Sequence, residues 1–261
     1  MIHMELNVVY NEDCLEGMNR IEDKSVDMIL CDLPYGTTKC KWDTIIPFDP
    51  LWKQYNRIIK DNGVIVLTGS QPFTSKLILS NIDNFRYEII WEKEQITNFV
   101  HIRKQIGKIH ENICVFYKKQ PTYNPQMRQG LLIKYSGSIN NINSHNNITS
   151  GKRKIEKTDK RFPISIIKIQ REKTKMHPTQ KPVKLFEYLI KTYTNEGDIV
   201  LDNCMGSGTT AIACMNTNRN YIGFELDKGY YDIILERIKN HKPDVKPDVI
   251  QESKQGLETW F

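Results

Sequence analysis

Residues 198–214 read DIVLDNCMGSGTTAIAC, an apolar run that ends at an acid and is followed by a glycine turn and the start of a helix. Glycines such as Gly206 and Gly208 let the backbone approach a ligand closely or adopt positive φ. The helix predicted from Thr209 offers unpaired N–H groups and a positive dipole end at the same place. The next apolar run, YIGF, ends at Glu225, where an acid can accept both ribose hydroxyls of a nucleotide. This stretch predicts a site for a ribose-bearing cofactor.

Short apolar, β-branched runs alternate with longer amphipathic stretches along most of the chain. Such alternation predicts an α/β fold with a doubly wound, mostly parallel sheet covered by helices on both faces. Strands are predicted at residues 6–10, 26–31, 64–68, 87–91, 113–117, 198–201 and 221–224. Helices are predicted at residues 14–21, 50–60, 72–81, 182–193, 209–215 and 228–240.

A second polar stretch, Asp32-Leu33-Pro34-Tyr35, directly follows the predicted strand VDMILC. In an open parallel sheet, ligands bind beyond the carboxyl ends of the strands. An acid, a proline-stiffened turn and an aromatic ring at such an end predict a pocket for a planar, hydrogen-bonding group. The alternative is an ordinary turn with Tyr35 packed in the core.

The glycine turn alone leaves the type of cofactor open. Counted from Gly206, the last position of a dinucleotide G-x-G-x-x-G/A pattern falls at Ala211, which that pattern tolerates. Dinucleotide domains usually begin with this strand, however, whereas here the strand ends near residue 201. Asp32 also has no evident role in hydride transfer. The placement therefore favours a cofactor other than a nicotinamide dinucleotide.

The whole chain has a formal net charge of +6, and its positive charge is concentrated in one segment. Residues 151–175 carry ten basic and three acidic side chains, a net charge of +7, so the remainder is nearly neutral. The wider segment 120–175 is polar, rich in asparagine and without periodicity. A segment of this length is too long for a structureless loop in a compact domain. We interpret it as a functional insertion that suits a phosphate backbone, with a solvated charged loop as the alternative.

The chain shows no sign of a membrane or secretory protein. No stretch approaches the roughly eighteen apolar residues of a membrane span, and the N-terminus lacks a signal-peptide apolar segment. We therefore expect a cytoplasmic protein. The six cysteines form no C-x-x-C pair and no zinc-type cluster, so we expect reduced, packed thiols and no metal.

Four motifs resemble those of the amino-group DNA methyltransferases. The stretch Asp32-Leu33-Pro34-Tyr35 is similar to their Asp-Pro-Pro-Tyr catalytic motif, and LDNCMGSGTTAIAC is similar to their S-adenosylmethionine loop. HPTQKPVKLFEYLI resembles the segment before that loop in the permuted β-class, and NEDCLEGM also resembles that class. The resemblance covers most of residues 6–118 and 176–240, and four motifs in this order are highly specific.

The resemblance implies a circularly permuted, Rossmann-like class I methyltransferase fold with a seven-stranded sheet. Strand 6–10 would stand third in the cofactor half and strand 26–31 fourth, while the first and second strands come last in sequence. Four regions follow from it. They are a catalytic half at 1–119, an inserted target-recognition region at 120–175, a cofactor-binding half at 176–242 and a tail at 243–261.

The resemblance also implies roles for individual residues. Asp32 and the carbonyl of Leu33 would accept the target amine hydrogens, Pro34 would stiffen the turn, and Tyr35 would stack on the flipped base. Glu225 would accept the ribose hydroxyls. The other residues implied to bind S-adenosylmethionine are Asp13 and Cys14 at the adenine, Thr179 and Lys181 near the methionine end, and Asp202, Asn203, Cys204, Gly206, Gly208, Thr209 and Thr210 in the loop.

The family motif has proline where this chain has Leu33, which keeps the carbonyl but gives up some rigidity. Asp rather than Ser at the first motif position favours adenine N6 over cytosine N4 as the target in double-stranded DNA. An N4-cytosine methyltransferase and a binding module without turnover remain the alternatives. Dimerisation is common in the class, so a homodimer is one candidate partner and a cognate restriction endonuclease is another, although no sequence pattern demonstrates either.

Overall fold

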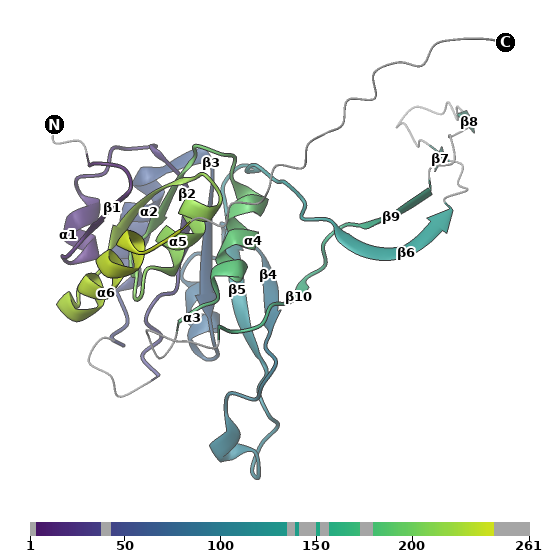
Figure 1. Ribbon diagram of the computed structural model, residues 1–261, viewed down its shortest axis with the longest axis horizontal. Helices are drawn as coiled ribbons and strands as arrows, with labels where there is room; N and C mark the ends of the chain where they lie inside the picture. Colours follow the sequence, from purple (N-terminus) through teal and green to yellow (C-terminus); the bar gives the residue numbers. More distant parts are fainter. Residues whose placement is uncertain are drawn as a thin grey trace.

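The computed structural model describes residues 4–37, 43–134, 139–140, 150–151, 157–172 and 180–242. An eight-stranded sheet with helices against both faces forms the body, and a long β-ribbon projects from one side of it (Figure 1). The strand order across the sheet is β1-β12-β11-β2-β3-β5-β4-β10. The pairs β3–β5 and β4–β5 are antiparallel and the other pairs are parallel, so the sheet is mixed but mostly parallel.

Each of the predicted strands overlaps a strand of the sheet. These strands are β1 (Val8–Tyr10), β2 (Val26–Cys31), β3 (Ile59–Gly69), β4 (Phe85–Glu92), β5 (His110–Phe116), β11 (Ile199–Asp202) and β12 (Asn220–Phe224). The late strands β11 and β12 lie between β1 and β2, as the permuted arrangement requires. This order brings the acid that follows β2 and the acid that ends β11 to the same edge of the sheet.

The prediction of seven strands is wrong by one. An eighth strand, β10 (Ile166–Lys168), lies inside the segment interpreted as an insertion and pairs in parallel with β4. The indole Nε1 of Trp91 donates to the carbonyl of Ile169 at 2.8 Å, which fastens the end of this strand. Three residues give no detectable periodicity, and the strand exists because β4 offers an open edge. The segment 120–175 therefore contributes to the sheet itself.

In the described residues, three helices cover each face of the sheet, the first three in chain order on one face and the last three on the other. They are α1 (Cys14–Met18), α2 (Phe48–Ile58), α3 (Phe73–Leu79), α4 (Val183–Tyr193), α5 (Thr209–Asn216) and α6 (Lys228–Lys239), and each overlaps a predicted helix. The first three contribute to one buried cluster and the last three to the other. The N-terminal part of the chain thus builds one layer and the C-terminal part the opposite layer.

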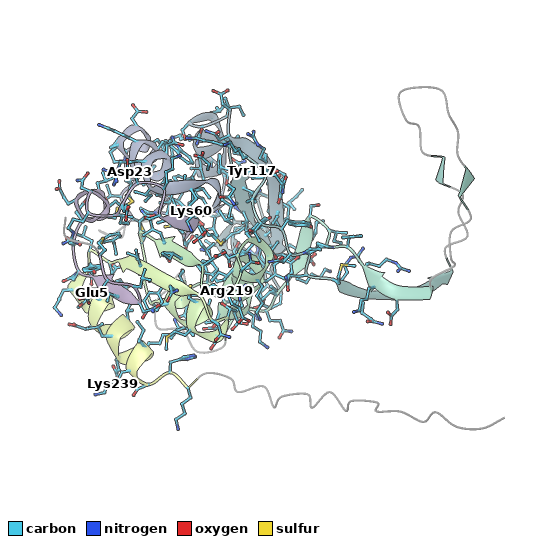
Figure 2. All side chains as sticks on the ribbon, turned by 90° about the horizontal axis from the view of Figure 1, so that it is seen from above. Glu5, Asp23, Lys60, Tyr117, Arg219 and Lys239 are labelled. Carbon is cyan, nitrogen blue, oxygen red and sulfur yellow. The ribbon has the colours of Figure 1, made fainter. Side chains whose placement is uncertain are left out.

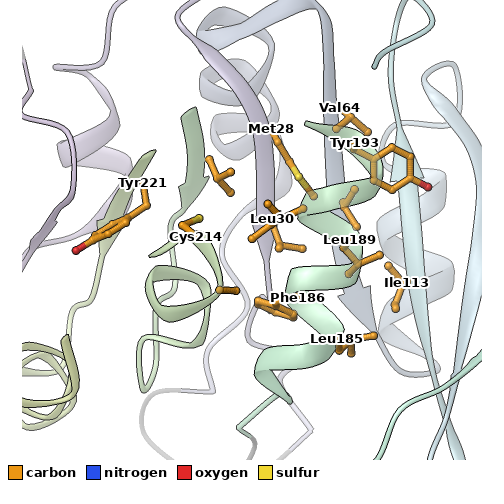
Figure 3. Close-up of a cluster of buried hydrophobic side chains, with 14 of the residues drawn as sticks. Met28, Leu30, Val64, Ile113, Leu185, Phe186, Leu189, Tyr193, Cys214 and Tyr221 are labelled. Carbon is orange, nitrogen blue, oxygen red and sulfur yellow. The ribbon is translucent and has the colours of Figure 1, made fainter. Parts of the chain in front are cut away.

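Strand β2 shows how the sequence places side chains on both layers. Met28 and Leu30 belong to the cluster under α4, whereas Ile29 and Cys31 belong to the cluster on the other face. Alternate residues of a strand face opposite sides, so a strand buried on both faces is apolar throughout. Figure 3 shows Met28 and Leu30 beside the apolar face of α4, which includes Phe186. This packing fixes the carboxyl end of β2 between the two layers.

The ribbon that leaves the body consists of β6 (Arg128–Lys134) and β9 (Lys157–Arg161), which pair antiparallel. Two shorter strands, β7 (Ile139–Asn140) and β8 (Ser150–Gly151), pair further along the same arm. Figure 2 shows the ribbon standing clear of the body, where side chains of the sheet and helices are gathered. In the part of the chain that the structure describes, no helix has the length and apolar character needed to cross a bilayer.

Candidate active site

A cavity of about 790 Å³ opens at the carboxyl ends of β2, β11 and β12. Its volume falls in the range of small-molecule sites, which is roughly 300–1,000 Å³. Both stretches singled out in the sequence, the Asp32 turn and the glycine turn that follows Asp202, contribute to its wall although 170 positions separate Asp32 from Asp202. The predicted residues at its wall are Asp13, Cys14, Asp32, Leu33, Pro34, Tyr35, Lys181, Asp202, Asn203, Cys204, Gly206, Thr209 and Glu225.

The carboxylate of Asp32 is held on both of its oxygens. The hydroxyl of Tyr35 donates to Oδ1 at 2.7 Å, and the hydroxyl of Thr68, which is fully buried on the neighbouring strand β3, donates to the same oxygen. The ammonium of Lys181 lies 2.5 Å from Oδ2. These contacts fix the carboxylate at the cavity wall with lone pairs left for a further donor.

The ring of Tyr35 is itself held in place. It stacks on Phe73, the first residue of α3, with a centroid distance of 5.1 Å and an interplanar angle of 29°. The turn that follows is braced by Asp43, whose two carboxylate oxygens accept the N–H groups of Gly36 and Thr37 at 2.8 Å each. Tyr35 is therefore part of the cavity wall and not an isolated core residue.

Lys181 belongs to a buried chain of alternating charges. Its ammonium also lies 3.3 Å from Oε2 of Glu111, and the other oxygen of Glu111 accepts from Lys93. Burial opposes ionisation of Glu111, but the two ammonium groups outweigh it and lower its pKa to about 2. Burial likewise disfavours the charged form of Lys181, but Asp32 and Glu111 outweigh it and raise its pKa. Lys181 is therefore a fixed cation beside the Asp32 carboxylate.

The glycine turn is organised by two acids at neighbouring strand ends. Asp202, which ends β11, accepts the N–H of Cys204 at 3.0 Å and the hydroxyl of Thr210. Burial raises the pKa of Asp202 from its ordinary 3.8 to about 6. Glu225, which follows β12, accepts the N–H of Gly206 at 2.7 Å, so its carboxylate is aligned along the cavity wall.

Glycine is required at both ends of the turn for different reasons. Gly206 and Gly208 have φ values of +54° and +79°, which L side chains rarely adopt. A Cβ on Gly208 would lie 2.9 Å from Cγ2 of the buried Ile234 in α6. A Cβ on Gly206 would meet nothing within 4 Å, because this residue faces the open cavity. Gly206 leaves room for a ligand, and Gly208 lets the start of α5 pack against α6.

The segment expected beside the cofactor adenine also lines the cavity. Asp13 caps α1, since its Oδ1 accepts the N–H groups of Leu15 at 2.8 Å and Glu16 at 3.3 Å. Cys14 is buried, and the amide of Asn203 donates to its Sγ at 3.5 Å. A hydrogen bond with Cys204, together with burial, holds the pKa of the Cys14 thiol far above its ordinary range. These thiols are neutral packing groups.

The predicted site residues differ in how they stand relative to the cavity. Thr210 is fully buried and reaches the ligand side only through Asp202, and Gly208 is not among the residues that line the cavity. Lys181, implied to approach the methionine end, lines the same cavity and is paired with Asp32. Lys93, which contacts Glu111, has only 8% of its side chain exposed. Thr179 lies outside the described residues.

Thr68, Glu111 and Gln180 belong to the site but were not predicted. Gln180 lines the cavity, and its amide accepts from the hydroxyl of Ser207 at 3.2 Å. Glu111 is one of two polar residues that precede the apolar run ICVF, and an acid at the start of a buried strand is a usable signal. Thr68 ends a buried apolar run and gave no signal, because a threonine fits a strand equally well as packing.

An α/β fold whose cavity joins a glycine turn to a fixed carboxylate is that of a nucleoside-cofactor-dependent enzyme. The family model described as DNA methylase, for N6 and N4 methyltransferases, matches residues 26–236. The chain therefore belongs to this family of S-adenosylmethionine-dependent DNA amino-methyltransferases.

Curated relatives and solved structures agree with this family. Type II methyltransferase M.HpaI of Haemophilus parainfluenzae is 28% identical over 238 residues, covering 87% of this chain and 72% of the relative. DNA adenine methyltransferase YhdJ of Escherichia coli (strain K12) is 25% identical over 256 residues, covering 90% and 83%.

Two solved structures show the same fold. The M1.HpyAVI–SAM complex has a TM-score of 0.60 at 24% identity, covering 88% of this chain and 98% of the other. PvuII DNA methyltransferase (cytosine-N4-specific) has a TM-score of 0.68 at 16% identity, covering 94% and 89%.

Proposed function

We propose that this chain methylates the N6 amino group of adenine at specific sites in double-stranded DNA, as a member of the permuted β-class, and that it flips the target base out of the helix. The observation that carries the proposal is the fixed carboxylate of Asp32 in the same cavity as the glycine turn. A duplex base must leave the stack to reach such a cavity, at a cost of a few kcal/mol.

The residues of the cavity fit S-adenosylmethionine. Open space at Gly206 admits a ligand close to the backbone, and Glu225 presents a carboxylate aligned for ribose hydroxyls. Asp202 would face the methionine moiety, and the segment at Cys14 would lie against the adenine. When bound, the cofactor supplies a methyl group activated by its attachment to a sulfonium sulfur.

Asp32 has the central role in the proposed chemistry. An exocyclic amine of a base is a poor nucleophile because its lone pair is delocalised into the ring. Asp32 and the carbonyl of Leu33 would accept its two hydrogens, which draws the nitrogen toward a pyramidal geometry and frees the lone pair. As positive charge develops on that nitrogen, the carboxylate stabilises it. The methylated nitrogen is acidic enough to lose its proton without a stronger base.

The remaining side chains position this carboxylate and the base. Lys181, Tyr35 and Thr68 fix the orientation of the Asp32 carboxylate, so little reorganisation is needed during the reaction. Tyr35, backed by Phe73 on one face, would offer the other part of its ring to the extruded base. Such stacking contributes about 1–3 kcal/mol per base.

The segment 120–175 is proposed as the target-recognition region. Its ribbon pairs Arg128 directly opposite Arg161, and like charges at facing positions destabilise an isolated ribbon. A phosphate backbone removes this repulsion, because cations that neutralise phosphates release the counterions of DNA. The basic residues of the arm therefore favour DNA as the partner over a purely structural role.

Cytosine N4 is the second candidate target, because the fold also matches the cytosine-N4-specific PvuII enzyme. Asp at position 32 and the relative named as an adenine methyltransferase support adenine. The deciding experiment incubates the chain with labelled S-adenosylmethionine and unmethylated genomic DNA, then identifies the labelled nucleoside. Label in N6-methyladenine is expected, and label in N4-methylcytosine would change the base while keeping the mechanism. No label with cofactor still bound would point to a binding module.

A further inference from the structure

The loop between β4 and β5, residues 93–109, exposes apolar side chains that none of the described residues covers. Phe99, Val100 and Ile106 are 72%, 88% and 93% exposed. Phe99 begins the short 3-10 helix η1 (Phe99–His101) at the far end of the loop. Large apolar side chains grouped on one exposed element mark an interaction site more often than isolated ones do.

The loop is braced internally rather than loose. Thr97 N–H donates to the carbonyl of Lys108 at 2.8 Å, and the Lys108 N–H donates to Oδ1 of Asn98 at 2.6 Å. The side-chain amide of Asn98 also donates to the carbonyl of Ile106 at 3.1 Å. A loop held by its own hydrogen bonds can present Phe99 to a partner without a large ordering cost.

The base of the loop is continuous with the candidate active site. Strands β3 and β4 both run antiparallel to β5, so the loop leaves the sheet at the same edge as Thr68 and Asp32. Figure 1 shows it projecting beyond this edge, below α3. The ammonium of Lys108 donates to Ser70, two residues after Thr68, and Lys93 pairs with Glu111.

The charge of the loop selects the kind of partner. The loop, residues 93–109, contains four cations, Lys93, Arg103, Lys104 and Lys108, and one acid, Glu94, which pairs with Arg171 outside the loop. A symmetric contact with a second copy would place these cations against one another, whereas a polyanion would neutralise them. Apolar side chains flanked by cations are also the pattern with which proteins insert wedges between base steps.

We propose that the 93–109 loop is a second DNA-contacting element, distinct from the 120–175 arm, which inserts Phe99 and Val100 into the duplex next to the target. Phe99 and Val100, here called the wedge, would fill the space that the extruded base leaves, which rests on the proposed base flipping. Arg103 and Lys104 contact the flanking phosphates. The wedge thus compensates for part of the lost stacking and favours the flipped state.

The test compares a paired duplex with one in which an abasic position faces the target base, once the methylated sequence is known. We expect Phe99→Ala/Val100→Ala to lower kcat/KM by about 10- to 100-fold on the paired duplex. On the abasic-partner duplex, where the target is already unpaired, the rate should recover to within about threefold of wild type. Leu79→Ala, at the far end of α3 and 73% exposed, is the matched control and should behave as wild type on both.

Phosphate contacts are tested separately by salt dependence. Arg103→Ala/Lys104→Ala should reduce the slope of log affinity against log salt by about 1–2, since each phosphate contact contributes about 0.9. Equal losses on both duplexes, or none on either, would overturn the wedge. A change in oligomeric state of Phe99→Ala/Val100→Ala in the absence of DNA would assign the loop to a second copy instead. Wild type that methylates no duplex would overturn the proposed function, whereas an unimpaired wedge variant overturns this inference alone.

Discussion

The ammonium of Lys181 lies 2.5 Å from the carboxylate of Asp32, although 149 positions separate the two residues in the chain. Lys181 has only 5% of its side chain exposed and also contacts Glu111. Asp32 is therefore oriented by a buried cation that lies two residues before the first residue of α4, Val183. This pair joins the two parts of the chain that precede and follow the basic segment.

Removal of Lys181 tests this relationship. Lys181→Met leaves Asp32 and Glu111 as neighbouring carboxylates without their shared cation, which destabilises the fold by about 3–5 kcal/mol. Methylation should fall by about 100-fold or more, because an unheld carboxylate loses its orientation. Glu111→Gln keeps the ion pair between Lys181 and Asp32, so its methylation rate should fall by less than tenfold. Unfolding curves and single-turnover methylation measure both effects, and wild-type rates in Lys181→Met would contradict the assignment.

Asp32 itself is tested by separating chemistry from cofactor binding. Asp32→Ala should reduce methylation by at least about 100- to 1,000-fold, the loss typical of a group that stabilises developing charge. Binding of S-adenosylmethionine, measured by calorimetry, should stay within about threefold of wild type. Loss of both properties together would rule out the proposed role of Asp32, provided that circular dichroism shows a folded variant.

The pKa of Asp202 predicts an unusual pH dependence of stability. Because its pKa is about 6 in the folded protein and 3.8 ordinarily, the folded state binds more protons between these values. The contribution of Asp202 to the free energy of unfolding is therefore fully present below pH 3.8. It falls by about 3 kcal/mol as the pH rises to about 6. Asp202→Asn has no such ionisation, so it should gain about 3 kcal/mol relative to wild type between pH 4 and pH 7. A constant difference between the two unfolding free energies would refute the shifted pKa.

The two glycines of the turn should respond differently to alanine. Gly208→Ala places a methyl group against Ile234 at positive φ and should cost about 1–3 kcal/mol of stability. Gly206→Ala also has the strain of a positive φ but meets no neighbouring atom, so it should cost less stability than Gly208→Ala. Its distinguishing effect should be weaker binding of S-adenosylmethionine, by about tenfold or more, because the methyl group enters the open cavity. Thermal unfolding and cofactor titration of both variants would separate these effects. The reverse pattern would mean that Gly206 does not face the cofactor.

The regular part of the fold was predictable because its signals are local. Apolar runs such as VDMILC are buried on both faces, and helix starts such as Thr209 follow their turns as predicted. The meeting of Asp32 and Asp202 in one cavity followed from the rule that ligands bind at carboxyl strand ends.

Other features depend on contacts that no local pattern encodes. β10 is a strand only because β4 leaves an edge for it, and its three residues show no alternation on their own. The partners of Lys181 and Lys93 follow from the antiparallel pairing that brings Glu111 to the active-site edge. The exposed apolar side chains of the 93–109 loop also resemble ordinary strand residues until their surroundings are known.

The pairing of Lys181 with Asp32 has a practical consequence for dividing the chain. One buried cluster is built mainly by helices that precede the basic segment and the other by helices that follow it, and the reaction centre needs a residue from each side. Two polypeptides separated within residues 141–149 would each retain complete secondary structure elements of the body. Co-expressed, they should reassemble through the β2–β11 contact and regain methylation, which makes the chain suitable for fragment complementation as a split reporter.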